Sequence, residues 1–173
     1  MHVSKSLAAA AWTLLVAGCT IPGPAPSPPL PATPGTAAVL GATETRIYRL
    51  VNAERKRQGL APLAYSSRLD RMARIQSQNM AHFHKMAHTL PGASLPTLGS
   101  RATYVGYPFG RLTENVAEMY PSPESVVQAW MNSSGHRHNI LDADVVETGI
   151  AISRSDAGGT YYCQVFGRLS ESL

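Results

Sequence analysis

Residues 146–167 read VETGIAISRSDAGGTYYCQVFG, and this stretch predicts a β-hairpin near the C-terminal end of the chain. Apolar residues alternate in part over 146–152, around Gly149, and residues 161–166 are aromatic and β-branched, as strands favour. Between them, residues 156–159 (DAGG) have the composition of a turn. We therefore expect two antiparallel strands joined by a short loop.

The chain before this hairpin has helical rather than strand periodicity. Ile47, Leu50 and Val51 recur at the spacing of one helix face, and Gly59 follows, so we expect a helix over 44–58. Helices followed by strands indicate an α+β domain in which helices cover a small antiparallel sheet.

A second helix is expected over 67–84. Ser67 is a candidate N-cap residue, and Asp70 follows at capping-box spacing. The residues that form its apolar stripe are Leu69, Met72, Ala73, Gln76, Met80 and Phe83.

Two further segments complete the coarse prediction. Glycine and proline are frequent over 90–110, which predicts a long loop. A third helix is expected to begin after Ser122, with Pro123 in its first turn, and to end at Gly135. Trp130 is expected in the core.

Composition limits the classes of function. The 173 residues suit one domain, and 44% hydrophobic against 15% charged residues exclude a disordered polyelectrolyte. The net charge is only +4, and the arginines are scattered rather than gathered in a basic stripe. We therefore expect no nucleic-acid partner.

The N-terminal residues have the features of a secretory signal. An apolar run over 7–17 is too short to span a bilayer of about 30 Å. Residues 16–19 (VAGC) resemble the lipobox of bacterial lipoproteins, which predicts a signal peptide over 1–18 and lipidation of Cys19. The alternative is an ordinary signal peptide with an incidental cysteine.

A tether is expected over residues 19–42. Residues 20–43 hold seven of the thirteen prolines and no charged residue, a composition that favours an extended chain. The domain would then occupy 43–173, anchored to a membrane through Cys19 in the cell envelope. Because Thr20 is not aspartate, the general behaviour of such lipoproteins implies the outer membrane if the organism has one.

Several separated motifs resemble the CAP superfamily, which contains the cysteine-rich secretory proteins, antigen 5 and the plant pathogenesis-related 1 proteins. The motifs, in order, are LVNAER (50–55), HT (88–89), ENVA (114–117), WMNSSGHRHNIL (130–141), GIA (149–151) and QVFG (164–167). The resemblance covers nearly all of residues 43–167. It implies an α-β-α sandwich with a cleft.

The resemblance also implies the site residues. Two histidines and two glutamates line the family's cleft, and by motif His88, Glu114 and His136 match three of these four positions. At the fourth position this chain has Ser133, as bacterial relatives commonly do. A mechanism that needs two carboxylates is therefore disfavoured.

The chemistry of these three residues leaves alternatives open. Two imidazoles and a carboxylate are suitable ligands for a divalent ion such as Zn²⁺, with His88 and His136 as the first candidates. The alternative is a polar network that only holds the fold together, since buried polar groups require partners. Cys163, in a predicted buried strand, is expected to be an inert thiol, and no cofactor is required.

Together these features predict an envelope lipoprotein whose CAP-like domain binds an envelope polymer, a lipid or a host protein. The rival hypothesis is a metal-assisted hydrolase of the peptidase kind that uses His88, Glu114 and His136. A third possibility is a structural module of the envelope.

Overall fold

The computed structural model describes residues 40–171. The helices are α1 (Ala42–Arg57), α2 (Ser67–Phe83), α3 (Leu98–Val105), α4 (Pro123–Asn132) and α5 (Ser134–Leu141), and the strands are β1 (Ala64–Tyr65), β2 (Phe109–Glu118), β3 (Glu147–Arg154) and β4 (Thr160–Leu169). The predicted signal peptide, Cys19 and the tether over 19–42 lie outside the described residues, except for the last residues of the tether. Within the described part, no helix is both long enough and apolar enough to cross a membrane.

The strands form one sheet in the order β1-β3-β4-β2. The predicted hairpin is confirmed: β3 pairs antiparallel with β4, from Glu147 opposite Gly167 to Arg154 opposite Thr160. β2 pairs antiparallel with the other side of β4. The two-residue β1 runs parallel to β3, so the sheet is antiparallel except at that short edge.

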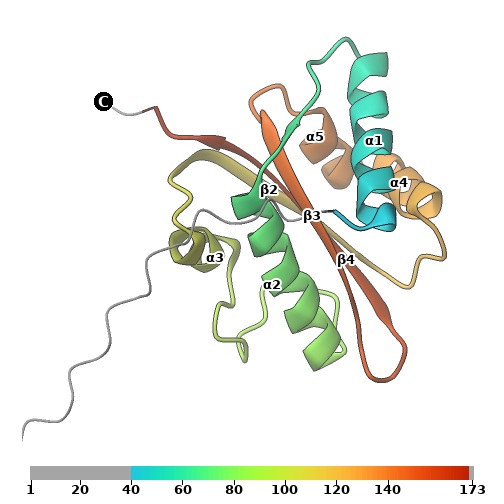
Figure 1. Cartoon of the computed structure of the whole chain (residues 1–173), viewed down its shortest axis with the longest axis vertical. Coiled ribbons are helices and arrows are strands. Elements are labelled where there is room, and N and C mark those ends of the chain that lie inside the picture. Colours follow the sequence, from blue (N-terminus) through green and yellow to red (C-terminus); the bar gives the residue numbers. More distant parts are fainter. Residues whose placement is uncertain (1–39, 172–173) are drawn as a thin grey trace, which may run out of the picture. The chain divides into compact units, whose positions relative to one another are not determined.

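Helices cover both faces of the sheet, which confirms the α+β class and the α-β-α sandwich (Figure 1). On one face, α2 and α3 enclose a core that includes Met72, Val116 and the buried Cys163. On the other face, α1, α4 and α5 enclose a second core around Trp130 and Phe166, so the expected burial of Trp130 is confirmed.

The prediction of a loop throughout 90–110 is wrong, because α3 and the start of β2 lie in it. Thr97 and Ser100 form a reciprocal capping box at the start of α3, and Gly106 ends the helix in the left-handed conformation. The prolines and most of the glycines thus flank α3 as boundary signals, while the helix holds only Gly99.

Two predicted helix boundaries are also wrong. Ser67 is the first helical residue rather than the cap, and the Asp70 carboxylate lies 3.3 Å from Arg74 instead of closing a capping box. Gly135 does not end the third helix: α4 stops at Asn132, and Gly135 lies in the separate helix α5. The predicted cap at Ser122 is confirmed by the bond from the Ser125 N–H to its hydroxyl.

A buried arginine fixes α5 in position. The Arg55 guanidinium of α1 donates to the carbonyls of Ile140 and Asp142, at 2.9 and 2.8 Å, where α5 ends. These carbonyls have no partner within their own helix, so a buried cation there satisfies them. The contact links α1 to the helix that carries His136.

Gly149 allows α2 to pack directly on β3. A Cβ atom at this position would lie 1.9 Å from the Asp70 nitrogen and 2.1 Å from the Leu69 carbonyl carbon, both of which are backbone atoms. Backbone cannot move aside as a flexible side chain does. The glycine therefore sets the separation between α2 and the sheet.

We predict that Gly149→Ala lowers the free energy of unfolding by about 3 kcal/mol or more, because overpacking here displaces backbone. The matched control is Gly99→Ala, where nothing lies within 4 Å of the added Cβ and alanine favours the helix. Chemical denaturation of both variants measures the effect. Equal stability of the two variants would contradict this account of the α2–β3 contact.

Candidate functional site

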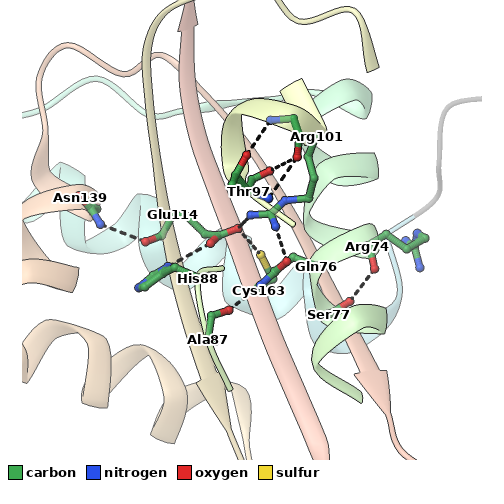
Figure 2. Close-up of polar contacts among 11 residues, drawn as sticks. Arg74, Gln76, Ser77, Ala87, His88, Thr97, Arg101, Glu114, Asn139 and Cys163 are labelled. Carbon is green, nitrogen blue, oxygen red and sulfur yellow. Dashed lines mark hydrogen bonds and ion pairs between the residues drawn. The ribbon is translucent and has the colours of Figure 1, made fainter. Parts of the chain in front are cut away.

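A buried ion pair forms the base of the site (Figure 2). Glu114 of β2 is 5% exposed, and its Oε2 lies 2.6 Å from a guanidinium nitrogen of the fully buried Arg101 of α3. Arg101 also donates to the side-chain oxygen of Gln76, which projects from α2. The Cys163 thiol, 3.4 Å away, donates to the same Glu114 oxygen. Burial raises the pKa of this thiol well above its usual value, so it remains protonated and unreactive.

His88 contacts the other carboxylate oxygen. Its Nδ1 lies 3.0 Å from Glu114 Oε1, while 58% of its side chain is exposed. The hydrogen bond to Glu114 raises the pKa of His88, although burial and the Arg101 charge act in the opposite direction. The preceding carbonyl, that of Ala87, accepts a bond from Gln76, so the same glutamine supports both Arg101 and the segment that carries His88.

His136 reaches the site from the opposite face of the sheet, on α5. Its backbone carbonyl accepts a bond of 3.1 Å from the Asn115 side chain. Asn139 binds the Asn115 side-chain oxygen at 2.9 Å and the Glu114 carbonyl at 3.2 Å, so α5 is held against β2. Burial and, secondly, the charge of His88 lower the pKa of His136.

Next to His136 lies a hollow of about 300 Å³, which we call the β2 cleft. Apolar side chains and the outer strand β2 form most of its wall. The lining residues used below are Met86, Val116, Glu118, Ala129, Trp130 and His136. An opening of this size accepts a side chain or a small part of a larger ligand.

Of the three predicted site residues, two are in direct contact and the third is not. His88 and Glu114 are in direct contact, whereas His136 is joined to β2 through the bond from the Asn115 side chain to its backbone carbonyl. A three-ligand metal centre does not fit this arrangement, because both Glu114 oxygens are already held by Arg101, Cys163 and His88. Within residues 40–171 no group of three or more histidine, cysteine or acidic side chains is placed to hold a metal ion. The imidazoles of His88 and His136 remain as candidate ligands.

Neither Arg101 nor the polar role of Gln76 was predicted from the sequence. A signal for Gln76 was present, because a glutamine within an apolar helix stripe is expected to need a buried partner. Arg101 gave no such signal, since its helix lies in the segment predicted as loop. Phe83, the last residue of the same stripe, is 40% exposed.

Comparison with known proteins agrees with the resemblance to the CAP superfamily. The model of the cysteine-rich secretory protein family (CAP) matches residues 48–166. The uncharacterized protein YkwD of Bacillus subtilis (strain 168) is 35% identical over 127 residues, which cover 73% of this chain and 48% of YkwD. This chain therefore spans about half the length of that relative.

Solved structures share the fold. An extracellular protein containing an SCP domain from Bacillus anthracis is similar with a TM-score of 0.65 and 29% identity, over 73% of this chain and 40% of that one. An outer surface protein from Borrelia burgdorferi has a TM-score of 0.67 and 21% identity, over 73% of this chain and 92% of its own. At that lower identity the likeness concerns the fold alone.

We predict that His88→Gln raises the pKa of His136, because the variant removes the nearby positive charge that lowers it. Histidine ring signals followed by NMR across a pH titration measure this. His84→Gln is the matched control, since His84 pairs with Asp156 and should leave His136 unchanged. If His136 titrates identically in both variants, the two imidazoles do not share one site.

Proposed function

Since this chain belongs to the cysteine-rich secretory protein (CAP) family, we propose that it is an extracytoplasmic binding module whose ligand occupies the β2 cleft. In this proposal the ring of His136, which lines the cleft, borders the ligand. The apolar wall of the cleft supplies the contact area. The buried Arg101–Glu114 pair keeps the cleft in shape.

The proposal rests on one observation: both oxygens of the Glu114 carboxylate already accept hydrogen bonds from neighbouring side chains. A general base has to come within hydrogen-bond distance of the proton that it removes. Both oxygens of Glu114 already accept bonds, and the side chain is almost completely buried. Glu114 thus supports the neighbouring His88, which favours recognition over turnover.

Metal-assisted hydrolysis has less support. A distant structural relative, NaASP2, was crystallised with Zn²⁺ and shares the fold at a TM-score of 0.53 and 12% identity. In this chain the carboxylate at Nδ1 of His88 would orient that imidazole as an outer-shell partner orients a ligand. His88 and His136 would be the only ligands among the three predicted residues, which is fewer than catalytic zinc sites use.

The predicted lipidation of Cys19 would place this module at a membrane in the cell envelope. The extracellular location stated for the Bacillus anthracis relative supports the extracytoplasmic part of the proposal. Residues 20–43 would hold the domain away from the bilayer. An envelope polymer, a lipid and a host protein are the candidate classes of ligand.

We expect an envelope fraction that contains the ligand to raise the melting temperature of the full chain. At a ligand concentration about 100 times the Kd, the stabilisation is about 2.7 kcal/mol. Polymer and lipid fractions are tested separately by differential scanning fluorimetry.

Ala129→Phe should abolish this shift, because the larger side chain fills the β2 cleft. Ala53→Phe, on the exposed surface of α1, is the matched control and should retain the shift. Equal shifts in both variants would contradict binding in the cleft, and the absence of a shift with every fraction would count against a binding function.

A further inference from the structure

The β2 cleft exposes part of an unpaired strand edge. Among the strands of residues 40–171, β2 is the last of the sheet and pairs only with β4. The Met119 N–H donates to Thr160 at 2.8 Å, so the backbone groups of alternate residues, counted back from Met119, face β4. The groups of Glu114, Val116 and Glu118 therefore face outward. Bonds from Asn139 to the Glu114 carbonyl and from Trp130 to the Val116 carbonyl, both 3.2 Å, confirm this direction.

Those two bonds satisfy only some of the outward groups. Across residues 40–171, no partner is present for the outward N–H of Val116 or for the N–H and C=O of Glu118. Val116 and Glu118 both line the cleft. Buried backbone groups are normally paired. The N–H of Val116 and the N–H and C=O of Glu118 are therefore available to bond with the backbone of another chain.

The shape of the cleft limits what can pair there. Met86, Trp130 and His136 line the hollow beside this strand edge, and a volume of about 300 Å³ holds a side chain rather than the edge of a second folded sheet. Met119 has a φ of 61° and ends the regular strand, which keeps the available edge short.

We propose that the β2 cleft binds an extended peptide segment, which pairs with Val116 and Glu118 as an added strand and places an apolar side chain in the hollow. This inference rests on the proposed function and names its ligand class. Only a polypeptide carries N–H and C=O groups that alternate with the same two-residue period as β2. Main-chain bonds then supply affinity, and the hollow selects the side chain.

The test uses a defined probe, the peptide Ac-Ser-Val-Thr-Val-Ser-NH₂, with the full chain. NMR follows the indole N–H of Trp130 as the peptide is added to about 1 mM, the range expected for so short a pairing. Two further peptides are N-methylated, one at both valines and the other at the threonine. Because alternate N–H groups of a strand point to opposite edges, only one of the two methylated peptides should lose binding.

The matched protein variants are Glu118→Pro and Glu118→Ala. Proline removes the outward N–H without breaking a bond to β4, so this edge strand tolerates it. We expect Glu118→Pro to bind the peptide about tenfold or more weakly than Glu118→Ala, which removes the same side chain but keeps the backbone N–H. Melting temperatures of both variants show whether each is folded.

The proposal is overturned if the peptide does not bind, if both methylated peptides bind equally, or if Glu118→Pro binds as well as Glu118→Ala. It is also overturned if Glu118→Pro converts a dimer into a monomer in sedimentation, because a second copy would then occupy the edge. A lipid fraction that stabilises the wild type but not Ala129→Phe, together with no peptide binding, would refute the peptide inference and leave the proposed function standing.

Discussion

The buried ion pair between Arg101 and Glu114 is the constraint on which the site depends. It joins α3 to β2 through a 2.6 Å contact between two side chains that have almost no exposure to water. A buried charge without its partner is strongly destabilising, so neither residue can change alone without cost. The pair also fixes the carboxylate that holds His88.

The same constraint is the basis of the proposed binding function. A carboxylate with both oxygens engaged by Arg101, Cys163 and His88 serves as a support for an imidazole rather than as a base or a third metal ligand. The features that are open to a ligand are the exposed imidazole of His88, the apolar hollow beside His136 and the outward backbone groups of Val116 and Glu118. These features suit the capture of a ligand at the edge of the sheet.

Periodicity in the sequence predicted the parts of the fold that are locally encoded. The hairpin over 146–166 and the helix over 44–58 follow from turn composition and apolar spacing, and both are present. Helix α3 was not predicted, because glycine and proline at its boundaries looked like loop composition. The approach of His88, Glu114 and His136 depends on tertiary contacts, so the resemblance to CAP proteins pointed to these residues while spacing alone did not. Arg101 was missed for the same reason as α3.

A double-mutant cycle on Arg101 and Glu114 tests the central claim most directly. Arg101→Met and Glu114→Gln should each lower the free energy of unfolding by about 3–5 kcal/mol, because each leaves a buried charged group without its partner. The double variant should lose much less than the sum of the two, which reveals the coupling. Effects that add to within about 0.5 kcal/mol would show that the two residues act independently, and the account of an engaged Glu114 would then be wrong.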